Sequence, residues 1–205
     1  SGSLALIKKY YPDAKIVGNK KTFDMMRGYY NVGNEEDEIV EVANGDTLSL
    51  GTHELVFTMI PMVHWPETMV TLDVTEHVLF SGDAFGCFGA LNGAFVDSEM
   101  NCDVYWNEMQ RYYSNIVGKY GPQVQALLKK AAALDIQTIC PLHGPVLTGD
   151  LSKYLAYYDT WSSYKPEEPE KILVASASIH GHTRAAAHQM AEKLRTKGAK
   201  VVEMD

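Results

Sequence analysis

Residues 54–83 read ELVFTMIPMVHWPETMVTLDVTEHVLFSGD, and this stretch decides the fold class. Short runs rich in β-branched and aromatic side chains alternate here with turn-forming residues such as 73–77. Further turn formers, at 44–46 and 51–53, divide the residues just before this stretch. The pattern predicts a meander of strands from Glu38 to Asp83.

Helical periodicity flanks these strands on both sides. Apolar residues at three- and four-residue spacing predict helices at 3–10, 20–29, 103–117, 122–134 and 150–163, and shorter runs predict strands at 15–18 and 137–142. Such alternation is typical of an α/β layer structure rather than a helical bundle or an all-β sandwich.

A change of composition near residue 165 indicates a domain boundary. Residues 165–170 are charged, contain two prolines and lack an apolar side chain, which is typical of a linker. The pattern then restarts with a strand at 171–177, a polar loop, a helix at 183–196 and a strand from 199. We therefore predict one domain at 1–164 and the βαβ opening of a second at 171–205.

The composition excludes several classes of protein. Of the 205 residues, 46% are hydrophobic, so disorder is excluded as the main state. The net charge is −8, which disfavours nucleic acid as a partner. The longest apolar runs, such as 55–60, are far shorter than the roughly 20 residues of a membrane helix. Three cysteines, with neither a CxxC pair nor a secretory leader pattern, favour a cytoplasmic location.

Three metal-ligand side chains each follow a hydrophobic strand: His64, Asp83 and His143. A lone histidine at a strand end is usually structural, but three such positions in order favour a metal site. Two imidazoles and a carboxylate suit iron or zinc, and a carboxylate can bridge two metals about 3.5–4 Å apart. Asp83 is the expected bridge.

Three motifs around these residues, at 64–69, 80–86 and 140–145, resemble in order and spacing those of the flavodiiron proteins. The resemblance implies an α/β fold, in which a metallo-β-lactamase-like αββα domain precedes a flavodoxin-like, doubly wound domain. It also implies that His64, Asp83 and His143 bind iron. In such enzymes electrons from FMN reduce dioxygen to water, nitric oxide to nitrous oxide, or both.

The resemblance further implies partners. Family members form head-to-tail homodimers or homotetramers, which bring one subunit's flavin to the other's irons, and they receive electrons from a donor such as rubredoxin or a flavin reductase. They also carry an earlier His-x-Glu-x-Asp-His motif with the remaining ligands. We therefore expect this chain to be an internal fragment that lacks the N-terminal part of the first domain and is inactive alone.

The loop Ser178-Ile179-His180-Gly181-His182-Thr183 lies between a predicted strand and a predicted helix. Backbone amides and hydroxyls at a helix N-terminus bind phosphate, although serine and threonine also cap helices without any ligand. The resemblance to flavodoxin favours binding of the FMN phosphate, while the two histidines depart from the usual flavodoxin loop.

Three further hypotheses stay open. Tyr112 and Tyr113 are candidates to reach the metal site from behind its ligands, although an aromatic residue at helical spacing more often belongs to the core. The rival enzyme is a zinc hydrolase of the metallo-β-lactamase fold, similar to a glyoxalase II-like thioesterase, and a third alternative is a degenerate domain kept for docking or dimerisation.

Overall fold

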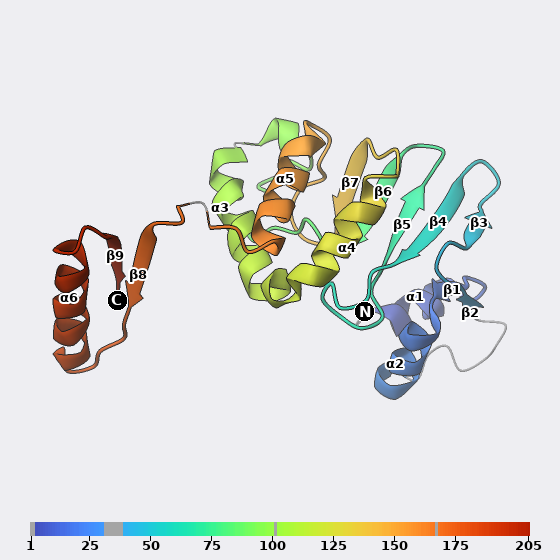
Figure 1. The fold of residues 1–205 in the computed structure, drawn as a ribbon. Helices are drawn as coiled ribbons and strands as arrows, with labels where there is room; N and C mark the ends of the chain where they lie inside the picture. The colour runs from blue at the N-terminus through green and yellow to red at the C-terminus, as the bar shows by residue number, and fades with distance from the viewer. Residues whose placement is uncertain (1–2, 31–38, 101, 167) are drawn as a thin grey trace. The chain divides into compact units, whose positions relative to one another are not determined.

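The computed structural model describes residues 3–30, 39–100, 102–166 and 168–205. The chain divides into two compact units, Ser1–Tyr164 and Lys165–Asp205. Each unit contains its own sheet or sheets and its own helices (Figure 1).

The larger unit begins with two helices and a small parallel sheet. Its first elements are α1 (Leu4–Tyr10), β1 (Ile16–Gly18), α2 (Lys20–Tyr30) and β2 (Ile39–Glu41). Because β2 pairs with β1, the expectation that all strands after residue 38 form one meander is wrong for β2. An apolar run predicts a strand but carries no information on its partner.

A five-stranded sheet forms the centre of this unit. Its strands, in their order across the sheet, are β3 (Thr47–Ser49), β4 (Glu54–Met59), β5 (Met69–Asp73), β6 (Val78–Gly82) and β7 (Thr138–Pro141). The first four are antiparallel neighbours, as a meander requires, whereas β7 pairs with β6 in parallel.

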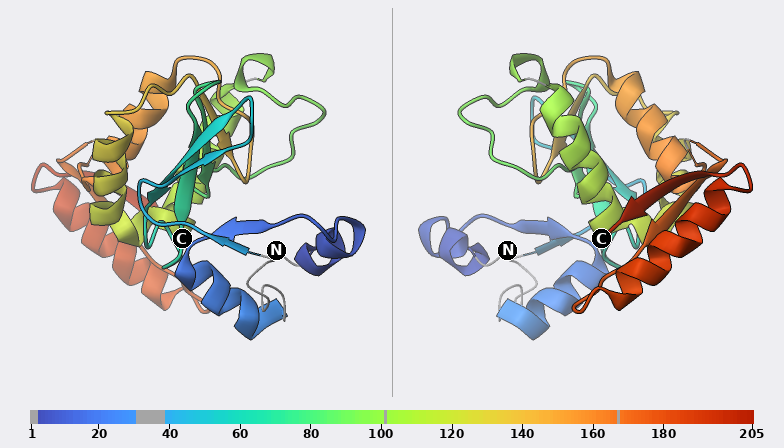
Figure 2. Two further views of the ribbon diagram at one scale, coloured as in Figure 1. Left: turned by 90° about the vertical axis from the view of Figure 1, so that its right-hand side faces the viewer. Right: turned by 90° about the vertical axis from the view of Figure 1, so that its left-hand side faces the viewer.

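The long connection from β6 to β7 is mostly helical, as a parallel crossover requires. It contains the 3₁₀ turn η2 (Asp97–Glu99), α3 (Cys102–Tyr112), the π-helical turn η3 (Tyr113–Val117), the 3₁₀ turn η4 (Gly118–Tyr120) and α4 (Gly121–Ala131). After β7 the chain forms α5 (Leu151–Ser162), whose first turn is capped by Asp150, the acceptor of the Ser152 amide. Figure 2 shows α4 and α5 side by side against one face of the sheet.

The strand register explains which face the helices cover. Leu72, Leu79 and Ile139 stand side by side on β5, β6 and β7, and each is at most 5% exposed. They belong to one hydrophobic cluster with residues of α3, α4 and α5. The neighbouring row faces the other way, and its Phe80 is 49% exposed.

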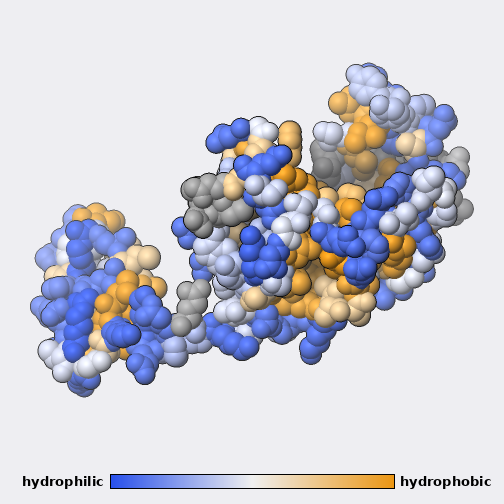
Figure 3. All heavy atoms as spheres, turned by 90° about the horizontal axis from the view of Figure 1, so that it is seen from above, coloured by the Kyte–Doolittle hydropathy of each residue, from blue (hydrophilic) through white to orange (hydrophobic). Residues whose placement is uncertain are grey.

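The smaller unit is a βαβ unit. It consists of β8 (Lys171–Ala175), α6 (His182–Arg195) and β9 (Lys200–Met204), with the two strands parallel. Several of its hydrophobic side chains, including Leu173, Met190 and Met204, are exposed, and Figure 3 shows apolar residues at the surface of both units. Among the described residues, no helix has the length and apolar character needed to cross a membrane.

A buried carboxylate fixes the hairpin end of the central sheet. Asp73 is 8% exposed and accepts hydrogen bonds from the amides of Thr75 (2.9 Å) and Glu76 (3.3 Å). Its other oxygen lies 2.8 Å from Nδ1 of His53. Burial acts to raise the pKa of Asp73, but these hydrogen bonds outweigh it, and the pKa is lowered.

Replacing Leu79 by alanine should lower the free energy of unfolding of the larger unit by about 2–5 kcal/mol, because it leaves a cavity in the core. Phe80→Ala is the matched control on the same strand, since half of that side chain is already in water. Its cost should be less than half as large. Urea unfolding followed by circular dichroism measures both, and equal losses would contradict the assignment of the two faces.

As the pH falls, the free energy of unfolding of the unsubstituted protein should decrease more steeply than that of the Asp73→Asn variant. A lowered pKa stabilises the folded state above the ordinary carboxyl pKa of about 3.9, and this contribution disappears as the pH falls through the folded-state pKa. The difference in unfolding free energy between the two proteins should therefore shrink from about pH 6 to about pH 3. A difference that stays constant over this range would show that the Asp73 charge does not stabilise the fold.

Candidate functional site

The structure brings His64, Asp83 and His143 together. Nε2 of His64 lies 3.1 Å from Oδ2 of Asp83, and Nε2 of His143 lies 3.6 Å from Oδ1. His64 belongs to the loop between β4 and β5, while the other two residues follow the ends of β6 and β7. The three predicted ligands therefore meet although they are far apart in the sequence.

The two imidazoles face different oxygens of the Asp83 carboxylate. Each oxygen is thus paired with one nitrogen donor, which is the arrangement expected of a carboxylate that bridges two metal positions. A single tetrahedral site would instead draw all donors around one point.

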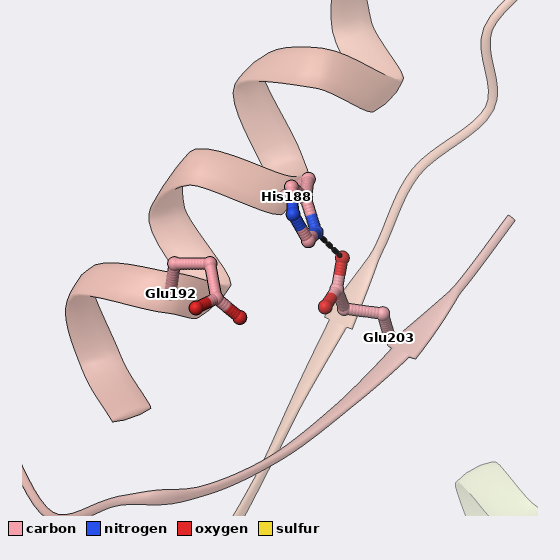
Figure 4. Close-up of side chains that lie close together, drawn as sticks. All are labelled: His188, Glu192 and Glu203. Atoms are coloured by element: carbon pink, nitrogen blue, oxygen red, sulfur yellow. Dashed lines mark hydrogen bonds and ion pairs between the residues drawn. The ribbon is translucent and has the colours of Figure 1, made fainter. Parts of the chain in front are cut away.

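A different group of donors is more compact. Within the described residues, His188, Glu192 and Glu203 have ligand atoms that all lie within 4.8 Å of one another (Figure 4). Glu203 is already paired with His188 at 3.0 Å, and Arg195 contacts both carboxylates at 2.6 Å. Because both carboxylates are exposed and already form ion pairs with this arginine, we assign no metal to this group.

The backbone around Asp83 is held in a tight turn. Gly82 has φ 62° and Phe85 has φ 65°, the left-handed region that is unusual for a phenylalanine. Two buried contacts fix this conformation: the Ser81 hydroxyl donates to the carbonyl of Ala84, and the Phe85 amide donates to the hydroxyl of Tyr158 at 2.6 Å. The direction of the Asp83 side chain is therefore set by the core behind it.

Tyr112 contacts the site, and Tyr113 does not. Burial, followed by the charge of Asp83 and a hydrogen bond to it, raises the pKa of Tyr112, whose ring lies 5.8 Å from the His143 ring. The phenol is therefore neutral beside the Asp83 carboxylate. Tyr113 packs against Tyr158 and Trp161, and burial raises its pKa to about 12.

An open cavity of about 690 Å³ reaches Asp83. Its walls are the site loops and α2, and its lining residues include Met25, Tyr29, Trp65, Glu67 and Leu142. Glu67 was not among the predicted site residues, and one of its carboxylate oxygens is buried without a hydrogen-bond partner among the described residues. The feature of the sequence that could have indicated Glu67 is its position three residues after His64.

The predicted phosphate loop is exposed and begins α6. Ile179, His180, Gly181, His182 and Thr183 are exposed, and Ser178 is half-buried. Gly181 is the N-cap residue of the helix, with φ 80° and no side-chain cap. The hydroxyls of this loop therefore do not serve as the N-cap, which leaves the phosphate hypothesis as a prediction.

Comparisons with known proteins agree with the fold. The family described as ODP family beta lactamase matches residues 1–144. A nitric oxide reductase of Moorella thermoacetica is 27% identical and covers 98% of this chain and 50% of that protein. The chain spans about half the length of the curated relatives it matches.

Two solved structures share the architecture. The rubredoxin oxygen:oxidoreductase of Desulfovibrio gigas superposes with a TM-score of 0.88 at 27% identity, over 99% of this chain and 50% of that one. The flavodiiron protein of Giardia intestinalis gives 0.83 at 27% identity, over 97% and 48%. These similarities confirm the resemblance to flavodiiron proteins and the metallo-β-lactamase-like fold.

The family match covers more than half of the chain and includes all three predicted ligands. The relatives with an activity in their names are oxidoreductases. This chain therefore belongs to the ODP family of beta-lactamase-like proteins, and its relatives and structural neighbours are flavodiiron proteins.

Proposed function

We propose that this chain takes part in reducing dioxygen to water, nitric oxide to nitrous oxide, or both, at a non-haem di-iron centre with electrons from FMN. The observation that carries the proposal is the Asp83 carboxylate, whose two oxygens face two different histidines. The names of the relatives, a nitric oxide reductase and a rubredoxin oxygen:oxidoreductase, support both substrates.

The residues present fit iron. His64, Asp83 and His143 supply two nitrogen donors and a carboxylate, the donor types that non-haem iron takes in proteins. Their side chains are 27%, 22% and 59% exposed, so a metal ion can reach the donor atoms from solvent. Three ligands leave coordination open, and we expect this chain alone to bind iron weakly or at one position and to show no oxygen reductase turnover.

Iron at this carboxylate would supply a one-electron redox change and open positions for a small diatomic molecule. Around it, the Tyr112 ring, whose centroid lies 5.8 Å from that of the His143 ring, limits the movement of that imidazole. The edge-on contact of Trp65 with the His64 ring, at 6.2 Å, restricts that imidazole in the same way. These contacts preorganise the donor atoms before a metal binds.

The cavity beside Asp83 suits a neutral substrate. The described residues that line it include two carboxylates, Glu67 and Asp83, and no lysine or arginine, and most of the other described side chains in its wall are apolar or aromatic. Negative charge at the wall disfavours anionic substrates, whereas dioxygen and nitric oxide are uncharged.

FMN is the cofactor proposed for the second unit. The first half of a phosphate site is formed by β8, the loop at residues 178–183 and α6. This follows because backbone amides at the N-terminus of a helix attract a phosphate dianion. Gly181 leaves open space at this point, since a Cβ built there has no neighbour within 4 Å. The remaining contacts to a flavin ring require further loops.

The proposed organisation follows from these two sites. Residues 1–164 carry the metal site, 165–170 act as a linker, and 171–205 begin the flavin domain. We further propose a cytoplasmic location, a head-to-tail homodimer or homotetramer, and a redox donor such as rubredoxin or a flavin reductase.

Substitution of Asp83 by alanine should weaken binding of Co(II), a spectroscopic substitute for iron, at least tenfold, because Asp83 contributes to both proposed metal positions. His64→Ala and His143→Ala should each weaken binding less, since the other pair of donors remains. His77→Ala is the control, because this histidine lies in a turn and pairs with Asp135. The visible absorption of Co(II) measures each affinity, and an unchanged affinity in Asp83→Ala would refute the site.

In the intact protein, where further loops hold the flavin ring, replacing both Ser178 and Thr183 by alanine should raise the dissociation constant for FMN at least tenfold. Each hydroxyl is expected to donate a charge-assisted hydrogen bond of roughly 1.5–3 kcal/mol to the phosphate. Riboflavin is the control ligand because it lacks the phosphate, and its affinity should not change. Quenching of flavin fluorescence measures both, and equal effects on the two ligands would show that the loop does not contact the phosphate.

A further inference from the structure

Asp97 is a buried carboxylate that holds the chain just after His143. It is 2% exposed and lies at the start of η2. Oδ1 accepts hydrogen bonds from the amide and the hydroxyl of Thr148, at 2.9 and 3.0 Å. Oδ2 accepts from the Gly149 amide at 3.3 Å and from the Tyr154 hydroxyl at 2.8 Å.

The segment that Asp97 holds is the returning arm of a hairpin with His143 at its tip. After β7 the chain turns back, and Leu147 exchanges two backbone hydrogen bonds of 2.9 Å with Ile139. Val146 forms a parallel bridge with Val96, the residue before Asp97. Side-chain and main-chain contacts therefore anchor the same few residues.

The tip of this hairpin is fixed through its backbone. The Leu142 amide donates to the Gly82 carbonyl at 2.8 Å, and the Cys87 amide donates to the His143 carbonyl at 3.1 Å. Gly144 has φ 90°, and a Cβ at this position would lie 2.6 Å from Cβ of Cys87. The turn thus packs directly against the residues that follow Asp83.

The His143 side chain depends on this backbone because little else holds it. It is 59% exposed, and among the described residues it contacts the Asp83 carboxylate and the Tyr112 ring. An exposed imidazole keeps its place only if the Cα from which it projects is fixed. Loss of the anchor at 148–149 would therefore move His143 away from Asp83.

We propose that Asp97 is a positioning residue for His143, which sets the distance of that imidazole from Asp83 without touching a metal or substrate. The proposal rests on the metal site proposed above. The negative charge of Asp97 is the feature on which this role depends. Burial acts to raise the pKa of Asp97, but the hydrogen bonds from Thr148, Tyr154 and Gly149 lower it, so the carboxylate is ionised.

Asp97→Asn is the sharpest test because each carboxylate oxygen faces a backbone amide. Whichever oxygen becomes the NH₂ group, a donor will then face a donor. Asp73→Asn is the matched control, since Asp73 is also buried and also accepts two backbone amides, but at the opposite edge of the sheet. Tyr154→Phe removes the hydrogen bond from the Tyr154 hydroxyl to Asp97 and serves as the milder variant if Asp97→Asn does not fold.

Co(II) titration of this chain should give about a tenfold weaker affinity in Asp97→Asn and no change in Asp73→Asn. The effect should vanish when Asp97→Asn is combined with His143→Ala, and it should persist with His64→Ala. A loss of equal size in both backgrounds would mean a general structural effect and would overturn the proposal.

Hydrogen exchange of the metal-free protein provides a second readout. The amides of Leu142 and Cys87, which hold the His143 tip, should exchange faster in Asp97→Asn than in Asp73→Asn. If the unsubstituted chain binds no Co(II), the proposed function fails, while the exchange rates still decide whether Asp97 holds the His143 loop. Unchanged exchange at both amides would overturn the positioning role.

Discussion

The parallel pairing of β6 with β7 is the constraint on which the site depends. Parallel strands end at the same edge of a sheet, so the residues that follow Gly82 and Pro141 leave it side by side. The hydrogen bond from Leu142 to the Gly82 carbonyl extends this pairing by one more step. Asp83 and His143 are therefore neighbours because of the sheet register. The helices between β6 and β7 form the crossover connection that two parallel strands require.

The candidate site combines solvent-accessible predicted ligands with a backbone that the core behind it holds in place. His143 is exposed and His64 is partly exposed. Tyr158, whose hydroxyl accepts a hydrogen bond from the Phe85 amide, is completely buried. The turn around Asp83 is fixed by the same aromatic core that stabilises α5 against the sheet. Access for a metal ion and rigidity of its ligands are thus provided by different residues.

The sequence predicted the parts of this arrangement that have a local signal. Periodicity located the strands and helices, and the positions of His64, Asp83 and His143 after apolar strands indicated a shared edge. The pairing of β2 with β1 and the contacts of Asp97 were not predictable, because they join residues remote in sequence without any local pattern. Tyr112 and Tyr113 were not distinguishable either, since the π-helical turn that begins at Tyr113 interrupts the helical period.

Two buried carboxylates show how the same interaction has different consequences at the two edges of the sheet. Asp73 and Asp97 both accept backbone amides, and in both these hydrogen bonds overcome burial and lower the pKa. Asp73 closes a turn at the edge where β5 ends and β6 begins, so its contribution is confined to stability. Asp97 fixes the segment that returns from His143, so we propose that it also sets the position of this predicted ligand. What a buried charge does for function is therefore decided by the segment that its hydrogen bonds hold, and at the edge where β6 and β7 end that segment carries the site.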